Sequence, residues 1–430
     1  MIRYNFEKKL REVVVVLDLF SGAGGLSEGF FRVNSTFVGH VEADAYACKT
    51  LKTRTAYWNL KNTNQLEIYH DYLLKKISTE ELWQIAGVSD SQDVINKEIS
   101  NNTFDDIVNT VKSNLASKNL NGVDVIIGGP PCQAYSVIGR ARMKEAVSCD
   151  PRNFLYKYYV QFLETFKPKM FIFENVPGLK SAGNGQYFED LKKAIDDAGY
   201  HIELDELIAS DYGVLQGRKR IIIVGWKKEN DKKYVYPDFE KIVNDKYFVS
   251  DVLNDLPKTT PGAKIEGKNK YTKPANQYLQ DSNIRDEGFD ILTQHETRPH
   301  NDRDREIYKE AILAWDTRKE RLCYKELSTR RSDLITHKNT TSFTNRFNVI
   351  KADERASHTI LAHMAMDGHY YIHPDIKQLR SLSIREAARL QSFPDDFYFE
   401  GPRTAIFRQI GNAVPPKMAE QIAKKIQELI

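Results

Sequence analysis

Residues 13–30, "VVVVLDLFSGAGGLSEGF", join a continuous apolar run directly to a glycine-rich turn. An uninterrupted apolar run is typical of a strand that is buried on both faces of a sheet. The glycines after it predict a tight turn that opens a helix. The dinucleotide pattern G-x-G-x-x-G is not quite met, because Ser27 stands at the third glycine position. The turn alone therefore leaves two interpretations open, a nucleotide cofactor site or a plain tight turn.

Similar short apolar runs recur along the chain and predict further buried strands. They are "FVGHVEAD" (37–44), "GVDVIIGG" (122–129), "KMFIFENV" (169–176) and "RIIIVGW" (220–226). Helical patterns separate them. In residues 153–166, Phe154, Tyr158, Phe162 and Phe166 recur every four residues before Pro168. Strands that alternate with helices predict an α/β fold with a doubly wound, mostly parallel sheet.

The chain changes character between residues 235 and 370, where apolar periodicity weakens and polar residues crowd in. Periodicity then returns. Ser383 and Glu386 form a capping-box pattern before Pro394, and the last helix carries Met418, Ile422, Ile426 and Leu429 on one stripe. We therefore expect a first domain at 1–234, a smaller one at 235–370, and a segment at 371–430 that returns to the first. Residues 62–92 are expected to be peripheral helix and loop.

Composition excludes several classes of protein. The net charge of the 430 residues is only +3, so the chain is no polycation, and any nucleic-acid binding must come from local basic surface. The four cysteines form no C-x-x-C pair, which argues against a zinc ribbon or a disulfide framework. No stretch approaches the roughly 18 apolar residues of a membrane span. The N-terminus imitates a signal peptide, but Asp18 interrupts its apolar run. We expect a soluble, cytoplasmic protein.

Four histidines between residues 358 and 373 invite a metal interpretation. They are His358, His363, His369 and His373. The same stretch holds Asp-Gly between alternating apolar residues, which is a β-hairpin signal. We therefore expect a hairpin here and no metal.

Six motifs, in this order, resemble those of cytosine-C5 DNA methyltransferases of the bacterial restriction–modification type. They are "DLFSGAGG" (18–25), "GGPPCQAYS" (128–136), "ENVPG" (174–178), "YGVLQGRKRIIIVG" (212–225), "REAARLQSFPDDF" (385–397) and "QIGNAVPP" (409–416). The resemblance covers roughly residues 12–230 and 355–430. It implies an S-adenosylmethionine-dependent methyltransferase fold, a catalytic domain at 1–234 and a target-recognition domain at 235–370.

The resemblance also implies catalytic roles. Cys132 would add to carbon 6 of cytosine, so that carbon 5 can take a methyl group, and Pro130 and Pro131 would stiffen its turn. Glu174, when protonated, would hydrogen-bond the ring nitrogen of the base. The remaining candidates are Asn175, Gln216, Arg218 and Arg220, with the arginines holding the flipped base and the carboxylate. Leu215 stands where the family usually has proline.

The cofactor candidates come from four parts of the chain. Glu42 ends the second strand, where an acid usually binds ribose hydroxyls. By resemblance, Glu98 would meet the adenine edge and Asn412 would close the pocket. The full set is Phe20, Ser21, Gly22, Ala23, Gly24, Gly25, Leu26, Glu42, Glu98, Pro130, Asn412 and Val414. The expected cofactor is S-adenosyl-L-methionine.

The expected partner is double-stranded DNA, with a cognate restriction endonuclease or defence system besides, and the chain is expected to be a monomer. The loop after Cys132 could close over DNA about Gly139. Candidate DNA contacts are Ser136, Arg140, Arg142, Lys144, Lys264, Lys268, Lys270, Arg330, Arg331 and Lys338. An RNA cytosine methyltransferase is the nearest alternative, but the long recognition segment favours DNA. A catalytically dead DNA-binding module and a nicotinamide oxidoreductase explain fewer of the motifs.

Overall fold

The computed structural model describes residues 13–130, 155–228, 236–335 and 344–430, and within them the main sheet has seven strands. Their order is β3-β2-β1-β4-β5-β7-β6. The strands are β1 (Val15–Leu19), β2 (Thr36–Glu42), β3 (Val94–Asn96), β4 (Val125–Gly128), β5 (Met170–Asn175), β6 (Tyr200–Ile208) and β7 (Lys219–Lys227). β1 to β5 pair in parallel, whereas β7 runs antiparallel to both β5 and β6. The predicted α/β class with a mostly parallel sheet is confirmed.

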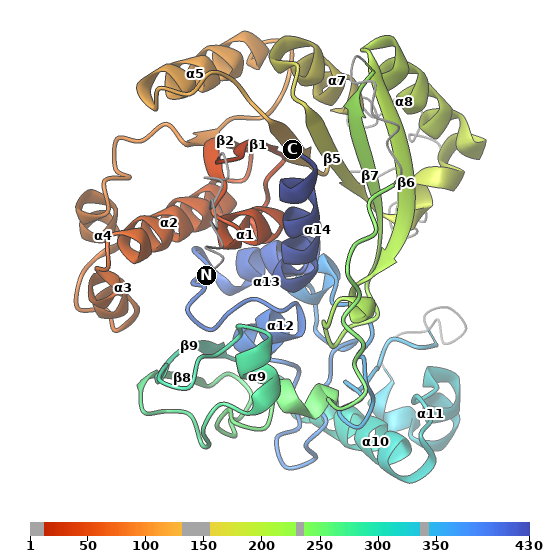
Figure 1. Ribbon diagram of the computed structural model, residues 1–430. Helices are drawn as coiled ribbons and strands as arrows, with labels where there is room; N and C mark the ends of the chain where they lie inside the picture. Colours follow the sequence, from red (N-terminus) through yellow and green to blue (C-terminus); the bar gives the residue numbers. More distant parts are fainter. Residues whose placement is uncertain (1–12, 131–154, 229–235, 336–343) are drawn as a thin grey trace, which may run out of the picture.

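Helices cover both faces of this sheet, which explains the uninterrupted apolar runs (Figure 1). One face packs against α5 (Phe104–Ser117), α7 (Leu155–Phe166) and α8 (Gln186–Asp197). The other packs against α1 (Gly25–Arg32) and α14 (Pro416–Leu429). Side chains alternate along β1, so that Val15 and Leu17 join the first core and Val16 joins the second. The C-terminal helix thus covers one face of the sheet that the N-terminal half of the chain builds, and α1 and α14 lie side by side.

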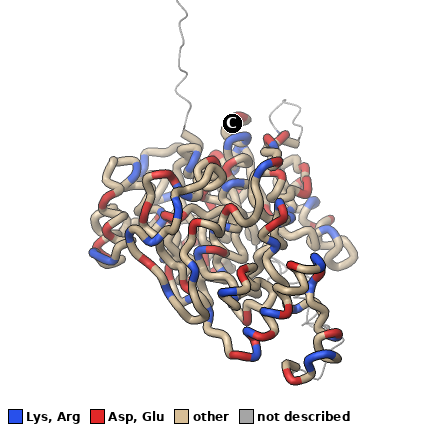
Figure 2. The backbone as a smooth tube through the Cα atoms, turned by 90° about the horizontal axis from the view of Figure 1, so that it is seen from below, with Lys and Arg blue, Asp and Glu red and all other residues tan. Residues whose placement is uncertain are grey.

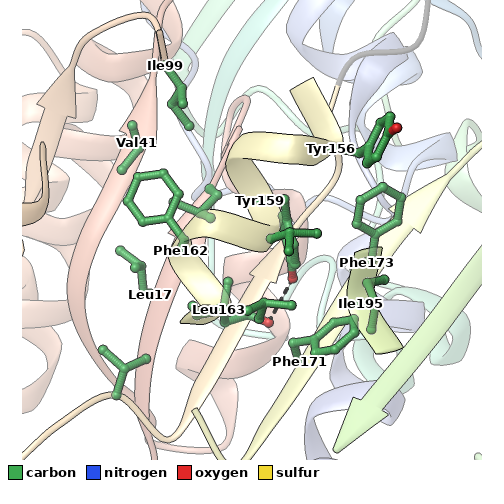
Figure 3. Packing of buried hydrophobic residues seen from close by; sticks show 14 of the residues in the cluster. Leu17, Val41, Ile99, Tyr156, Tyr159, Phe162, Leu163, Phe171, Phe173 and Ile195 are labelled. Atoms are coloured by element: carbon green, nitrogen blue, oxygen red, sulfur yellow. Dashed lines mark hydrogen bonds between the residues drawn. The ribbon is translucent and has the colours of Figure 1, made fainter. Parts of the chain in front are cut away.

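Helix α7 was predicted correctly from residues spaced by four, of which Phe154 lies outside the described residues, but the other three are not buried alike. Tyr159 and Phe162 are fully buried, whereas Tyr158 and Phe166 are only partly buried. Positions spaced by four drift about 40° per step around a helix of 3.6 residues per turn, so four of them cannot share one narrow face. The Tyr159 hydroxyl lies 3.1 Å from the Ile126 carbonyl oxygen and 2.9 Å from that of Ile172, which fixes α7 across β4 and β5. Figure 3 shows Tyr159, Phe162, Phe171 and Phe173 in this core.

The segment predicted as peripheral helix and loop contains two short helices. They are α3 (Leu66–Leu73) and α4 (Thr79–Ile85), and both pack against α2 (Ala45–Asn62). Tyr57, Trp58, Tyr69 and Leu82 lead a separate apolar cluster that these helices share. Because Ile291 of β9 (Ile291–Glu296) belongs to the same cluster, the segment extends α2 toward the polar part of the chain.

The polar segment folds mainly at the opposite side of the molecule from α5, α7 and α8 (Figure 1). Its elements are β8 (Lys264–Lys268), α9 (Gln277–Asp281), β9 (Ile291–Glu296), α10 (Asp302–Arg318) and α11 (Tyr324–Arg330). It shares one apolar core with the returning segment, in which Val249 and Leu279 pack in the same cluster as Leu382 and Phe393. The domain boundaries at 234 and 370 remain predictions, but the packing crosses the second of them.

Two helices follow in the returning segment, α12 (Ile384–Leu390) and α13 (Arg403–Asn412). The predicted capping box begins α12. The Ser383 hydroxyl accepts from the Glu386 amide at 3.2 Å, and the Glu386 carboxylate accepts from the Ser383 amide at 2.7 Å. Of the last helix's predicted stripe, Met418, Ile422 and Ile426 are fully buried and Leu429 partly so.

The hairpin prediction for residues 358–373 is wrong. This stretch forms a short 3-10 helix, η7 (Ala362–Ala365), and no β-ladder. Its backbone groups bond to side chains from elsewhere, since Gln216 accepts from the Ile360 amide and Arg298 donates to three carbonyl groups between Met364 and Met366. Those contacts replace the cross-strand ladder that the local pattern predicted. Among the described residues there is no cluster of three or more His, Cys, Asp or Glu arranged to hold a metal ion, and no helix long and apolar enough to cross a membrane.

Candidate active site

The glycine turn after β1 adopts a backbone conformation that explains its composition. Phe20, Gly22 and Gly24 all have positive φ, at 56°, 54° and 82°. Glycine reaches this region without strain, which side chains with a Cβ do not. A Cβ on Gly25 would lie only 2.3 Å from the carbonyl oxygen of Val414, so the turn also touches the C-terminal segment closely. The glycine turn therefore packs directly against residues 413–414.

Ser27 replaces the third glycine of the dinucleotide pattern for a visible reason. Its hydroxyl donates to the Asp18 carboxylate, and both residues are almost fully buried. The His40 ring on β2 stands 3.4 Å from the same carboxylate. Asp18 therefore joins α1 and β2 beneath the turn. Ser27, which stands at the third glycine position, stabilises the turn through this hydrogen bond.

Glu42 ends β2, as predicted, and its carboxylate organises the turn. One oxygen accepts from the Gly22 amide at 2.8 Å, and the other accepts from the Asp44 amide at 2.8 Å. Burial raises the pKa of Glu42, while these backbone hydrogen bonds oppose the rise. The Asp44 side chain then caps α2 by accepting from the Tyr46 and Ala47 amides. A single acid thus links the glycine turn to the beginning of the next helix.

These residues line a cavity of about 550 Å³ at the carboxyl ends of the parallel strands. A crevice at this edge of an open α/β sheet is the usual place for a ligand. Glu98 follows β3 and lines the cavity, as do Pro130 after β4 and Asn412 on α13. Every proposed cofactor residue lines it except Gly24, namely Phe20, Ser21, Gly22, Ala23, Gly25, Leu26, Glu42, Glu98, Pro130, Asn412 and Val414.

Glu174 and Arg220 meet at the other end of the same cavity. The Glu174 Oε1 atom lies 2.5 Å from Arg220 Nε, across the antiparallel pair β5–β7. Burial lowers the pKa of Arg220, and the Glu174 carboxylate opposes that shift. A Cβ on Gly129 would lie 2.5 Å from Glu174 Oε2, so glycine leaves room for the carboxylate there. Asn175 donates to the Pro130 carbonyl at 3.2 Å and thereby fixes the backbone that leads into residue 131.

Gln216 and Arg218 lie deeper than Arg220, and both are fully buried. Arg218 donates to the carbonyl oxygens of Ile360 at 2.8 Å and Gly411 at 3.0 Å. Burial lowers the pKa of Arg218, and the neighbouring Arg220 charge adds to that effect. Gln216 donates to the Leu390 carbonyl at 2.9 Å. These two side chains join the returning segment to β7, whereas Arg220 faces the cavity. Leu215, at the family's usual proline position, is buried in the core shared with the polar segment.

Several cavity residues were missed by sequence reasoning. Asp44, Lys97, Arg408 and Gln409 also line the cavity. Arg408 and Gln409 precede Asn412 by four and three residues on α13, so helical spacing from a proposed site residue could have found them. Lys97 adjoins Glu98 directly, but nothing in its local pattern separated it from a solvated lysine.

The proposed nucleophile, Cys132, lies outside the described residues, as do Pro131, Gly139 and four proposed DNA contacts, Ser136, Arg140, Arg142 and Lys144. Lys338 also lies outside them. The other candidate DNA contacts are described. Lys264 and Lys268 on β8 form ion pairs with Glu266 and Asp290, at 3.2 and 3.8 Å.

Arg330 and Arg331 at the end of α11 pair with Glu310 and Asp333, at 2.6 and 2.9 Å. Lys270 is exposed. Basic and acidic residues are interspersed along this side of the chain (Figure 2). DNA phosphates would therefore have to compete with neighbouring carboxylates for most of these side chains.

Comparisons with known proteins identify the family of the chain. The family model described as C-5 cytosine-specific DNA methylase matches residues 14–78 and 71–428. Type II methyltransferase M.Bpa9945I of Bacillus paralicheniformis is 39% identical over 455 residues, covering 97% of this chain and 99% of that protein. Type II methyltransferase M.AgeI of Thalassovita gelatinovora is 28% identical, covering 96% and 99%.

A solved structure of a prophage-encoded protein from E. coli shares the fold, with a TM-score of 0.62, 22% identity, and coverage of 97% of this chain and 99% of that one. The family match spans nearly the whole chain, and the alignment with the 39% identical relative covers 97% of it. The chain therefore belongs to the C-5 cytosine-specific DNA methylases and is a DNA cytosine methyltransferase.

Proposed function

We propose that this enzyme transfers a methyl group from S-adenosylmethionine to carbon 5 of a cytosine flipped out of duplex DNA, through a covalent adduct at Cys132. The observation that carries the proposal is one cavity with two chemically different ends. One end holds the glycine turn with Glu42 and Glu98, and the other holds the Glu174–Arg220 pair. A cofactor and a target base can meet in such a cavity.

The described residues fit the cofactor chemically. Both carboxylate oxygens of Glu42 accept hydrogen bonds from backbone amides and have further acceptor capacity for ribose hydroxyls beside Gly22. Glu98 at the end of β3 suits the exocyclic amino group of adenine, because a carboxylate accepts hydrogen bonds. Asn412 and Val414 would close the cavity from α13 and the residue pair after it. The bound cofactor supplies an electrophilic methyl group.

The base end suits activation of cytosine. Attack of the Cys132 thiolate on carbon 6 places an electron pair on carbon 5 and charge on the ring nitrogen. A protonated Glu174 can donate to that nitrogen, and Arg220 holds the carboxyl group in position. After carbon 5 has taken the methyl group, it loses its proton, and the thiolate leaves carbon 6. Asn175 contributes by holding the Pro130 carbonyl, which leads into the Pro131–Cys132 turn.

The polar segment at 235–370 would recognise the DNA sequence. A cytosine inside a duplex must be flipped out before its ring atoms can be reached, at a cost of a few kcal/mol. Two relatives are named type II methyltransferases. We infer by analogy that this chain serves a restriction–modification system in the cytoplasm, as a monomer with a cognate endonuclease.

The test is trapping on DNA that carries 5-fluorocytosine. Fluorine cannot leave carbon 5 as a proton does, so the Cys132 adduct should persist as a denaturation-resistant complex that needs S-adenosylmethionine. Cys132→Ala should abolish trapping while cofactor and DNA affinities remain. A matched RNA duplex provides the control for the alternative substrate. Trapping by the alanine variant, or faster trapping on RNA than on DNA, would overturn the proposal.

A further inference from the structure

Arg408 stands out among the charged side chains that line the cavity. Three of them are cations, Lys97, Arg220 and Arg408. Lys97 forms an ion pair with Asp106, and Arg220 forms one with Glu174. Arg408 is exposed and forms no ion pair or hydrogen bond with any residue that the structure describes. It is therefore the cation in this lining whose donors are free for a ligand, within the described part of the chain.

Five carboxylates line the cavity, but none of them forms an ion pair with Arg408 in the part of the chain that the structure describes. These are Asp18, Glu42, Asp44, Glu98 and Glu174. The first three accept hydrogen bonds from Ser27 and from backbone amides, and Glu174 pairs with Arg220. An arginine that faces a cavity rich in acids without collapsing onto one of them is available for an anion that arrives from outside.

The backbone of α13 that carries Arg408 is anchored by its neighbours on the helix. Arg218 bonds the Gly411 carbonyl, and Gln391 bonds the Ile410 carbonyl at 2.6 Å. Gln409 accepts from Thr50 at 2.7 Å. With the helix fixed at several points, the stripe of Ala405, Arg408, Gln409 and Asn412 lines the cavity. The backbone that carries Arg408 is thus already positioned before a ligand binds.

The position on α13 favours one anion. The adenosine part of the cofactor belongs at Glu42 and Glu98, and its methyl group must point toward Glu174 and Arg220. The amino-acid tail is then left for the third wall, which α13 and the glycine turn form together. We propose that Arg408 binds the carboxylate of the methionyl tail of S-adenosylmethionine. This inference rests on the proposed function, because it assumes that cofactor.

Calorimetry with two ligands tests the assignment. Decarboxylated S-adenosylmethionine keeps the adenosine, the sulfonium and the amino group, and lacks only the carboxylate. Arg408→Ala should weaken S-adenosylmethionine binding about tenfold or more, since it removes charge-assisted hydrogen bonds to the carboxylate. The same variant should bind the decarboxylated ligand as wild type does. Arg408→Lys should recover part of the affinity. Lys97→Ala is the matched control, and it should change the affinities of the two ligands by equal factors.

The outcomes separate the possible failures. Equal losses for both ligands in Arg408→Ala, or no loss for either, would overturn the carboxylate assignment. Arg408 would be a DNA ligand instead if Arg408→Ala left cofactor affinity unchanged and weakened DNA binding. The slope of log K against log salt concentration should then fall by about one phosphate contact. Failure of wild type to bind S-adenosylmethionine would overturn the proposed function itself.

Discussion

Arg218 and Gly411 are joined by a hydrogen bond of 3.0 Å although 193 residues separate them in the chain. The other terminal guanidinium nitrogen of Arg218 bonds the Ile360 carbonyl at 2.8 Å, so one fully buried side chain holds together α13, the residues before η7 and the residues before β7. Gly411 has no room for a side chain, because a Cβ there would lie 2.1 Å from the Ala362 amide nitrogen. This contact therefore couples the α13 wall of the cavity to the segment that leads into β7.

Arg218→Lys should weaken cofactor binding without removing any group that touches the cavity. Lysine has one ammonium group and cannot hold two carbonyls in the geometry of a guanidinium. We expect α13 to lose its fixed position and the affinity for S-adenosylhomocysteine to fall about tenfold or more. Calorimetry measures this, with Lys219→Ala as the control, because Lys219 is exposed and pairs with Glu206. Wild-type affinity in a folded Arg218→Lys protein would show that α13 needs no such anchor.

Glu174→Gln tests the acid beside Arg220. The amide keeps the shape of the carboxyl group and loses its titratable proton. Methyl transfer should slow by about 10²–10⁴, the usual contribution of a positioned acid, whereas DNA affinity should change little. Single-turnover rates and DNA binding curves give the two values. Activity within a few-fold of wild type would remove Glu174 from the mechanism.

Glu42→Ala and Asn412→Ala should each weaken S-adenosylmethionine binding, although the two residues lie in different parts of the chain. Glu42→Ala would remove the contacts of this carboxylate to the ribose and to the Gly22 amide. Asn412→Ala would remove a side chain that closes the cavity at α13. Glu42→Gln should fall between wild type and alanine, because an amide retains one acceptor oxygen. Calorimetry that gives wild-type affinity for Asn412→Ala would mean that the returning segment does not close the site.

Sequence recognition should move with the polar segment. Exchanging residues 258–350 for their counterpart in a relative of known specificity should transfer that relative's target, since base readout needs side chains that reach base edges. Bisulfite sequencing of DNA from cells that express the chimera would report the methylated sites. A folded chimera that still methylates the original sites would assign recognition to another part of the chain.

Glu386 should make stability depend on acid pH. Burial alone would raise its pKa, but the Arg380 guanidinium, 2.7 Å away, outweighs burial and holds the pKa of Glu386 well below its usual range. Because the folded-state pKa is depressed, the stabilising effect is full above about pH 4.5, the ordinary value, and is lost as pH falls through and below it.

Glu386→Gln should therefore lower the free energy of unfolding at neutral pH by about 3–5 kcal/mol, because it leaves buried Arg380 without its counter-charge. Its stability should also fall less than that of wild type between pH 5 and pH 3. Denaturant titrations at neutral pH and at several pH values in the acid range measure the free energy of unfolding and therefore both effects. Glu428→Gln removes an exposed acid paired with Lys425 and should change stability by less than about 1 kcal/mol. Equal acid sensitivity of wild type and Glu386→Gln would contradict this account.

The sequence by itself determined the features that are encoded locally. The apolar runs marked five strands correctly, because burial on both faces demands continuous apolar residues. It did not mark β6, an edge strand in which most side chains are at least partly exposed and polar residues alternate. The sequence placed the glycine turn, Glu42 and Glu174 at the ends of apolar runs, and they line one cavity because parallel strands end at the same edge of a sheet.

Only the tertiary structure decided which distant groups bond to one another. Residues 358–373 carry a hairpin pattern, yet their backbone groups form hydrogen bonds with the side chains of Gln216 and Arg298 instead of with a partner strand. Arg218 and Arg220 are only two residues apart in the chain, but their side chains have different partners. Arg218 bonds the carbonyl groups of Ile360 and Gly411, whereas Arg220 pairs with Glu174 in the cavity. A local pattern records whether a side chain is apolar and how it recurs. It does not record which partner the packing of other segments brings within hydrogen-bond distance, and that partner decides what the residue does.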